Sequence, residues 1–307
     1  MLEVKNLHKT FGGFTAVQGI SFTLNPGDIF GFIGSNGAGK TTTIRMLSTL
    51  LEPTSGTATL NGIDILENPM QIRRMIGYMP DFFGLYDDVK VWEYLDFFAS
   101  IYGVQKRDKV IDEVLELTDL GIKKHSFVQS LSRGMQQRLC LARCLVHDPK
   151  LLLLDEPASG LDPRARSELK GLITELGKMG KIVIVSSHIL PELSDFCTSV
   201  GIIERGNLLA FGDVASVVRS IRPTKLVRIQ CISDLISLDK MVSKAANVQK
   251  CEKVGANELL VELMGGDEDQ ARLLKAIVDD GHQVINFSED EANLEDVFLK
   301  LTTGAVN

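Results

Sequence analysis

The sequence lacks any apolar run that could cross a membrane. A transmembrane helix needs about 20 consecutive apolar residues, and no hydrophobic stretch in these 307 residues approaches that length. The N-terminal residues Met1 to Lys5 also lack the apolar segment of a signal peptide. We therefore expect the chain to stay in the cytosol.

A general excess of basic residues is also missing. The sequence has 33 Lys and Arg against 40 Asp and Glu, which gives a net charge of −7. A protein that binds nucleic acid or anionic lipid over much of its surface usually carries the opposite balance. Any contact with such a partner must therefore be local.

Cysteine is scarce, and no two cysteines form a C-x-x-C pair. The five cysteines are scattered along the chain: Cys140, Cys144, Cys197, Cys231 and Cys251. Thiol redox motifs and structural zinc sites usually need closely spaced pairs. We expect reduced thiols that pack as small hydrophobic side chains.

The most informative stretch is the glycine-rich run from Gly34 to Thr41, which reads G-x-x-x-x-G-K-T. It follows the apolar run Ile29 to Ile33, a candidate buried strand, and continues into a helical segment, Thr41 to Leu47. Such glycines let backbone N–H groups converge at a helix N-terminus and bind phosphate. Lys40 would then face the β- and γ-phosphates, and the Thr41 hydroxyl would bind Mg²⁺. A glycine-rich turn that binds nothing is the alternative, but it does not explain the lysine, threonine and helix at these spacings.

Two further apolar runs end in polar residues that could act at the same place. The first, from Lys150, has four leucines followed by Asp155 and Glu156, and the second, from Lys181, ends at His188. A continuous apolar run is typical of a central parallel strand, and ligands bind at the carboxyl ends of such strands. We expect these side chains to lie beside the glycine-rich loop. The alternatives are a solvated strand end for Glu156 and a structural role for His188.

Strand and helix patterns alternate around these runs. Alternating apolar and polar residues over 2–7 and 19–24 predict antiparallel strands at the start of the chain. Residues 85–147 carry apolar side chains at helical spacing, which predicts a helical insert between strands. Phe11 stands at the first turn, where it could stack on a flat ligand or cover the edge of the core, and its position alone favours neither.

A second pattern of strands and helices begins beyond Gly212. The predicted order is β-α-β-β-α-β, a ferredoxin-like unit. Its elements are expected at 226–232, 235–246, 248–254, 258–263, 267–280 and 283–287, with a final helix at 294–301. No phosphate or metal motif occurs in this part. We therefore divide the chain into a domain that carries the glycine-rich loop, 1–217, and a ferredoxin-like accessory domain, 218–307.

One more motif, Leu131 to Arg138, reads L-S-R-G-M-Q-Q-R and precedes the strand that carries Asp155. Together with the motifs above, it makes the first domain resemble the nucleotide-binding domain of ATP-binding cassette (ABC) transporters. The resemblance implies an α/β fold, namely a P-loop NTPase core with an antiparallel β subdomain and an inserted helical subdomain. The small ferredoxin-like α+β domain would follow it.

The resemblance also implies roles for individual residues. In that family Glu156 matches the catalytic glutamate, which orients or deprotonates the attacking water, and His188 matches the switch histidine at the γ-phosphate. Lys40 would be catalytic with them, and Ser159 to Asp162 match the D-loop. The implied ATP-binding residues are Phe11 on the adenine and Ser35, Asn36, Gly37, Ala38, Gly39, Lys40, Thr41 and Thr42 on the phosphates. The implied signature residues, which contact ATP held by a partner subunit, are Ser132, Arg133, Gly134 and Met135.

The resemblance also implies a function for the whole chain. Two such domains sandwich two ATP molecules head to tail, and hydrolysis reopens the sandwich and drives a membrane domain. The C-terminal ending Leu294 to Leu299 is similar to that of ATP-binding subunits of exporters whose permease is a separate chain. We therefore expect an ATPase that uses ATP and Mg²⁺, pairs with a second identical or different ATPase subunit, and energises export by a polytopic membrane permease. It would lie at the cytoplasmic face of the cell membrane and bind no nucleic acid.

Other classes of protein remain as alternatives. A soluble ABC ATPase that acts on nucleic acid or the ribosome would be expected to have paired cassettes, a long coiled-coil insert or zinc cysteines, and this sequence has none of them. A nucleotide sensor without catalytic activity would not need Asp155, Glu156 and His188 together.

The sequence departs from the family pattern at two positions. Arg133 replaces a glycine of the signature motif, which affects how closely the backbone can approach the opposite nucleotide. Asp81 replaces the usual glutamine after Pro80. An aspartate can accept a hydrogen bond from water or bind Mg²⁺, but it cannot donate. The expected metal ligands are therefore Thr41, Asp155 and Asp81.

Overall fold

The computed structural model describes residues 1–82, 84–86, 88–188, 193, 195–221, 224–232 and 234–290. The chain divides into two compact units, Met1–Val214 and Ala215–Asn307. In the described part of the chain, no helix is long and apolar enough to cross a membrane. The helix predicted at 294–301 lies outside the described residues.

The N-terminal unit begins with an antiparallel sheet of strand order β2-β1-β4-β5. Its strands are β1 (Leu2–Phe11), β2 (Phe14–Leu24), β4 (Ser55–Leu60) and β5 (Ile63–Asp64). The two-residue turn between β1 and β2 uses Gly12 at φ 54°, a conformation that glycine adopts without strain. The predicted pair of antiparallel strands is confirmed, with both strands longer than expected.

A second sheet of six strands, in the order β10-β9-β3-β8-β7-β6, forms the centre of this unit. All neighbouring strands are parallel except β10, which is antiparallel to β9. The strands are β3 (Ile29–Ile33), β6 (Ile76–Met79), β7 (Leu151–Asp155), β8 (Ile182–Ser187), β9 (Ser199–Glu204) and β10 (Asn207–Asp213). Every residue of β3, β7 and β8 is buried, as the continuous apolar runs predict.

Helices α1 (Lys40–Leu47), α2 (Pro69–Met75) and α6 (Pro163–Lys178) pack on these sheets. Helix α1 contacts β2 of one sheet and β7 of the other, and its Ile44 and Met46 belong to the core cluster that both sheets share. The N-terminus of α6 is capped by Asp162, whose carboxylate accepts a hydrogen bond from Ala165 N at 2.8 Å.

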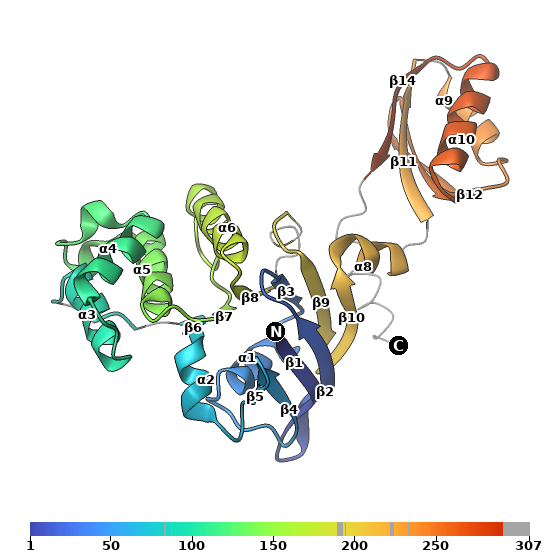
Figure 1. Cartoon of the computed structure of the whole chain (residues 1–307). Coiled ribbons are helices and arrows are strands. Elements are labelled where there is room, and N and C mark those ends of the chain that lie inside the picture. The colour runs from blue at the N-terminus through green and yellow to red at the C-terminus, as the bar shows by residue number, and fades with distance from the viewer. Residues whose placement is uncertain are drawn as a thin grey trace. The chain divides into compact units, whose positions relative to one another are not determined.

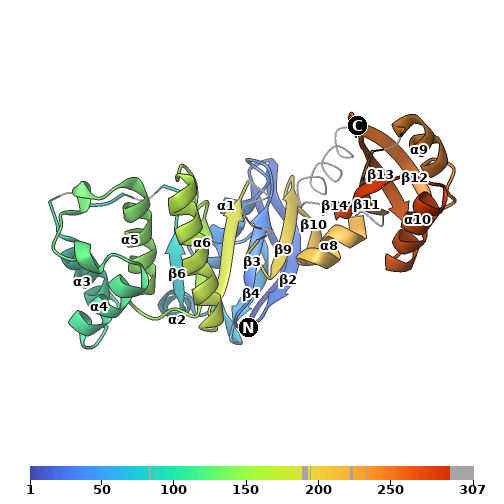
Figure 2. The same cartoon turned by 90° about the horizontal axis from the view of Figure 1, so that it is seen from above.

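The predicted helical insert is present as α3 (Val91–Ile101), α4 (Arg107–Leu117) and α5 (Arg133–Leu145). These helices gather at one end of the unit, beyond β6 (Figures 1 and 2). Helix α5 joins the insert to the central sheet, because the Cys144 thiol donates to the Tyr78 carbonyl of β6 at 3.2 Å. Gly77 allows this approach, since a Cβ there would lie 2.7 Å from the Cys144 carbonyl oxygen.

The C-terminal unit has the predicted ferredoxin-like topology. After α8 (Val214–Ile221), the strands β11 (Thr224–Cys231), β12 (Val248–Gly255), β13 (Glu258–Met264) and β14 (Val284–Asp290) form an antiparallel sheet of order β12-β13-β11-β14. Helices α9 (Leu235–Val242) and α10 (Asp267–Asp279) cover one face of this sheet (Figure 1). Helix α9 ends four residues before the predicted limit at 246.

Candidate functional site

The strand order of the central sheet brings three distant segments together. Strand β3 is paired with β8, and β8 with β7, so that Ile33 lies beside Ser187 and Asp155 beside Ser186. Since the strands are parallel, the residues that follow them meet at one edge of the sheet. The glycine-rich loop after β3 therefore lies beside Asp155, and beside Glu156 and His188 just beyond β7 and β8, as predicted.

Two glycines allow the loop to close against the neighbouring strands. A Cβ on Gly34 would lie 2.4 Å from the Ile203 carbonyl oxygen, and one on Gly39 would lie 2.6 Å from the Ala16 carbonyl oxygen. Gly39 also has φ 113° and gives the N-terminus of α1 no side-chain cap. The first N–H groups of α1 are thus not satisfied by a side chain of the capping residue, which suits them to bind an anion.

Lys40 is folded into the loop that it follows. Its side chain is only 6% exposed, and Nζ donates to the Gly34 carbonyl at 2.6 Å and to the Ser35 carbonyl at 3.2 Å. Nζ also lies 3.6 Å from Glu156 Oε1. Burial lowers the pKa of Lys40, while the charges of Glu156 and Asp155 oppose that shift. The loop thus holds a buried cation next to two carboxylates.

Two hydroxyl groups converge on the carboxylate of Asp155. Thr41 Oγ1 donates to Oδ1 at 3.2 Å and Ser186 Oγ donates to the same oxygen at 2.7 Å. Asp155 is 1% exposed. Hydroxyl and carboxylate oxygens are the hard donors that Mg²⁺ prefers, so Thr41 and Asp155 fit that ion. No group of three or more His, Cys, Asp and Glu in the described residues could hold a metal by itself.

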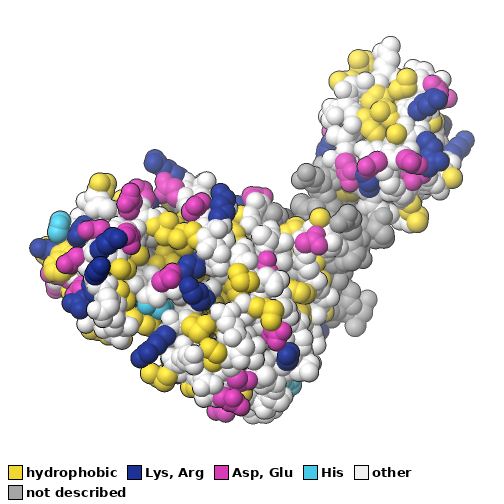
Figure 3. Space-filling view, viewed as in Figure 1, with side chains coloured by type: hydrophobic (Ala, Val, Ile, Leu, Met, Phe, Trp, Pro, Cys, Tyr) yellow, Lys and Arg dark blue, Asp and Glu magenta, His cyan; other side chains and the backbone are white. Residues whose placement is uncertain are grey.

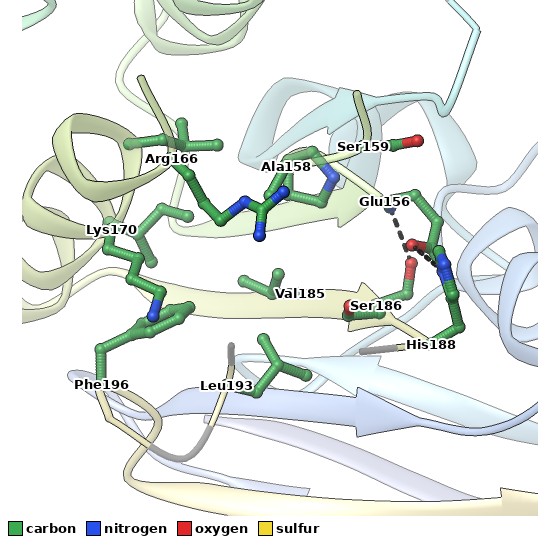
Figure 4. Close-up of a pocket in the computed structure, with 14 residues that line it drawn as sticks. Glu156, Ala158, Ser159, Arg166, Lys170, Val185, Ser186, His188, Leu193 and Phe196 are labelled. Atoms are coloured by element: carbon green, nitrogen blue, oxygen red, sulfur yellow. Dashed lines mark hydrogen bonds and ion pairs between the residues drawn. The ribbon is translucent and has the colours of Figure 1, made fainter. Parts of the chain in front are cut away.

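Glu156 is held in a strained conformation at the end of β7. Its φ is 50°, and its N–H donates to Ser186 Oγ at 2.9 Å. His188 Nδ1 lies 2.9 Å from Glu156 Oε2. Figure 4 shows the Glu156 carboxylate beside the His188 ring and the Glu156 N–H bonded to the Ser186 hydroxyl, at one end of a cavity whose other end is lined by Lys170 and Phe196. Ser186 therefore holds the backbone of Glu156, and His188 orients its carboxylate.

Two polar residues in this region were not predicted. Ser186 connects Asp155 with the N–H of Glu156, and Glu204, the last residue of β9, accepts a hydrogen bond from Ser35 Oγ at 2.9 Å. Each is a polar residue at the carboxyl end of a buried parallel strand. The same signal identifies Asp155 in the sequence, so it could have identified these two as well.

Phe11 lies at the tip of the β1–β2 turn with 47% of its surface exposed. The Lys9 ammonium lies 5.1 Å from the centre of its ring. Of the two readings left open by the sequence, covering the edge of the core fits this exposure poorly. An exposed ring of this kind is suited to stack on a flat ligand.

The predicted signature residues are placed at the start of α5. Ser132 caps this helix by accepting a hydrogen bond from Met135 N at 3.4 Å. Gly134 allows close packing on α6, since a Cβ there would lie 3.0 Å from Ala165 Cβ. In the described part of the chain, none of these residues shares a hydrogen bond with the group formed by Lys40 and Asp155.

Asp81 is exposed and follows the end of β6 by two residues. Burial raises the pKa of Tyr78, and the charges of Asp155 and Asp81 add to this effect. The Tyr78 ring is therefore within electrostatic reach of both carboxylates. Within the described residues, Asp81 takes no part in the hydrogen bonds that join Thr41, Asp155 and Glu156.

The sequence matches two protein families. Residues 17–159 match the family described as ABC transporter, and residues 212–302 match the one described as ATP-binding protein DrrA1-3-like, C-terminal domain. The bacitracin transport ATP-binding protein BcrA of Bacillus licheniformis is 36% identical over 305 residues, which cover 99% of this chain and 98% of BcrA. The Nod factor export ATP-binding protein I of Burkholderia lata is 33% identical over 303 residues, or 98% of this chain and 96% of that protein.

A solved structure described as the ATP-binding subunit of an ABC transporter is also similar. It is 30% identical, superimposes with a TM-score of 0.66, and covers 72% of this chain and 92% of its own. These similarities confirm the predicted fold class and the predicted ATPase activity. The motifs, the fold and relatives aligned over almost the whole length agree, and the chain belongs to the family of ABC transporter ATP-binding proteins.

Proposed function

We propose that this chain binds and hydrolyses ATP to energise export by a separately encoded polytopic permease, on the cytoplasmic face of the cell membrane. Two sets of contacting residues carry the proposal. Lys40 and His188 contact Glu156, Thr41 contacts Asp155, and Ser186 joins the two sets. The names of the relatives, one a transport protein and one an export protein, support the assignment to transport. The DrrA-like C-terminal domain supports an exporter with a separate permease.

The phosphates of ATP would occupy the concave side of the glycine-rich loop. The N–H groups at the start of α1 point there, and Lys40 supplies a positive charge beside them. Binding requires Lys40 Nζ to exchange its present acceptors, the carbonyls of Gly34 and Ser35, for phosphate oxygens. The proposed nucleotide contacts comprise the predicted set, with adenine on Phe11 and phosphates on Ser35, Asn36, Gly37, Ala38, Gly39, Lys40, Thr41 and Thr42.

Thr41 and Asp155 would hold Mg²⁺, with Asp81 as a proposed additional ligand. When bound, this ion neutralises charge on the β- and γ-phosphate oxygens. The Asp155 carboxylate is already fixed by two hydroxyl donors, so its position does not depend on the ion. This fixed geometry supports Asp155 as the primary protein carboxylate of the site.

Glu156 is the proposed base for the attacking water. Asp155 is committed to its hydroxyl donors, which leaves Glu156 as the carboxylate able to accept a proton from water or to orient it. The ion pair with Lys40 at 3.6 Å and the hydrogen bond with His188 at 2.9 Å fix both oxygens of the Glu156 carboxylate. His188 also has a second ring nitrogen, which could contact the γ-phosphate.

A second ATPase subunit would complete the site. Ser132, Arg133, Gly134 and Met135 begin a helix, yet they share no hydrogen bond with the phosphate-binding group in the described part of this chain. This arrangement supports a role toward a nucleotide that a partner subunit holds. The partner would be a second copy of this chain or a similar ATPase, in a head-to-tail dimer that closes on ATP.

A nucleic-acid-binding ATPase is the alternative function. On the face shown in Figure 3, Lys and Arg side chains are interspersed with Asp and Glu side chains and form no continuous basic stripe. Nucleic-acid binding usually requires such a stripe. Co-purification distinguishes the two, since a polytopic membrane protein supports the transporter and nucleic acid supports the alternative.

The substitution Glu156→Gln tests the proposed function. The amide has nearly the same shape as the carboxylate but cannot act as a base, so we expect ATP binding to persist and turnover to fall by about 100-fold or more. Size-exclusion chromatography with Mg-ATP should show the variant as a stable dimer. Glu175→Gln on α6 is the control, because this exposed glutamate pairs only with Lys178 in the described structure. Turnover of the Glu156 variant at the parent rate would refute the mechanism.

A further inference from the structure

Arg133, the residue that departs from the signature pattern, contacts the D-loop of its own chain. Its guanidinium group lies against Gly160, since a Cβ on that glycine would be 2.5 Å from Arg133 Cζ. Gly160 has φ 68° and therefore adopts a backbone conformation that disfavours a side chain. The arginine thus occupies the space that a side chain at position 160 would need.

Two donors from α5 converge on the carbonyl oxygen of Ser159, the residue before Gly160. Arg133 Nη2 donates to it at 3.3 Å, and Gln137 Nε2 donates to it at 3.4 Å. A carbonyl oxygen has two lone pairs and can accept both bonds. Arg133 and Gln137 lie one helical turn apart, on the same side of α5. The first two turns of α5 therefore fix the D-loop through one acceptor.

The D-loop is also connected to Glu156, the proposed catalytic base. Ser159 N donates to the Glu156 carbonyl at 3.1 Å, which closes a tight turn between these residues. Glu156 has φ 50° and is held from its other side by Ser186. A displacement of the Ser159 carbonyl therefore changes the backbone that orients the Glu156 carboxylate.

We propose that Arg133 is a positioning residue that couples the N-terminus of α5 to Glu156 of the same chain. The inference rests on the proposed function, in which the start of α5 faces ATP held by the partner subunit. It assigns the direct contacts with that ATP to Ser132 and Gly134, and gives Arg133 the contact with Ser159 instead. Binding of that phosphate fixes the first turn of α5, and Arg133 transmits the constraint to Ser159 and so to Glu156. Hydrolysis in one site then depends on nucleotide in the other. A glycine at position 133 would leave only Gln137 to make this connection.

A competing role for Arg133 makes a different prediction. An arginine that turned away from Ser159 to bind the partner's phosphate directly would contribute to ATP affinity. Its loss would then raise KM for ATP. A positioning residue acts on the geometry of Glu156 after ATP is bound, so its loss lowers kcat and leaves KM nearly unchanged.

The experiment compares Arg133→Gly and Arg133→Lys with the parent, using the full-length protein over a range of ATP concentrations. Loss of one exposed hydrogen bond and of the packing on Gly160 is expected to lower kcat about 5-fold for Arg133→Gly. KM should change by less than about 2-fold, and any cooperativity in ATP should decrease. Arg133→Lys retains a donor for Ser159 and should recover at least half of the parent kcat. Arg164→Ala is the control, since this 91% exposed arginine on α6 pairs with Glu168.

A structural measurement accompanies the kinetics. Amide hydrogen exchange of residues 156–161, measured without nucleotide, should be faster in Arg133→Gly than in the parent or in Arg133→Lys. Parent-like kcat in Arg133→Gly, or a raised KM with unchanged kcat, overturns the inference. If Glu156→Gln still lowers turnover in the same assay, only the inference fails. If Glu156→Gln has no effect, the proposed function fails as well.

Discussion

Ser186 provides a strict test of how the active-site carboxylates are held. Its hydroxyl donates to Asp155 Oδ1 at 2.7 Å and accepts from Glu156 N at 2.9 Å, and the residue is fully buried. In Ser186→Ala both bonds are lost, and the Glu156 N–H is left without its acceptor. A hydrogen bond to a charged group contributes about 1.5–3 kcal/mol, and an unsatisfied buried donor costs about 1–3 kcal/mol. We therefore expect the free energy of unfolding to fall by about 2.5–6 kcal/mol.

The same substitution should slow catalysis. Asp155 keeps only the longer bond from Thr41, and the backbone of Glu156 loses the contact that holds its positive φ. Since a small misplacement of a catalytic group is costly, we expect kcat to fall about 10-fold or more. Urea unfolding and steady-state ATPase assays measure the two effects separately.

A matched control lies in the same sheet. The hydroxyl of Ser199 on β9 is buried and has no hydrogen-bond partner among the described residues. Ser199→Ala removes this unsatisfied group, so stability should stay the same or rise slightly. If Ser186→Ala and Ser199→Ala unfold at the same urea concentration and turn over at the parent rate, the account of the carboxylate geometry is wrong.

Three further predictions concern other parts of the chain. Burial lowers the pKa of His147, whose Nε2 contacts the Ile76 carbonyl at 2.9 Å, so the folded state disfavours the protonated ring. The Tm of the parent should therefore decrease as the pH is lowered from 7.5 to 5.5, because the unfolded state binds the proton more readily below about pH 6.5. The Tm of His147→Gln should decrease less over the same range. Asp81→Ala should weaken the Mg²⁺ dependence of the ATPase rate, and Asp81→Gln should restore the behaviour of the family, which has glutamine at this position. Superimposable Mg²⁺ titrations for the parent and both variants would make Asp81 an ordinary turn residue. A fragment of residues 1–217 should fold alone and gain Tm with Mg-ATP, and an insoluble or unresponsive fragment would refute that domain boundary.

The sequence predicts the central part of the site well because two physical signals coincide there. Continuous apolar runs identify β3, β7 and β8 as buried parallel strands, and polar residues just after such strands must meet at one edge. Ser186 and Glu204 carry the same strand-end signal, since each lies at the carboxyl end of a buried parallel strand. The contact of Arg133 with Ser159 carries no such signal, because Arg133 lies in a helix and only the folded chain brings it to the D-loop.

Helix boundaries were harder to predict than helix positions. Helix α9 ends at Val242, although the two alanines that follow, Ala245 and Ala246, favour helix. The Ala245 carbonyl instead accepts a bond from Val248 N in the turn that leads to β12. Tertiary pairing of the next strand therefore overrides the local preference.

The attachment of α5 to β6 has a mechanical consequence. The bond from Cys144 to Tyr78 and the close packing at Gly77 place a fulcrum near the C-terminal end of a 13-residue helix, while Ser132 and Arg133 lie at the opposite end. A helix of that length is a lever arm of about 20 Å, so a tilt of about 10° about the fulcrum would move its tip by about 3 Å. That displacement exceeds the tolerance of a hydrogen bond, and a tilting insert would thus release the Ser159 carbonyl in an all-or-none manner.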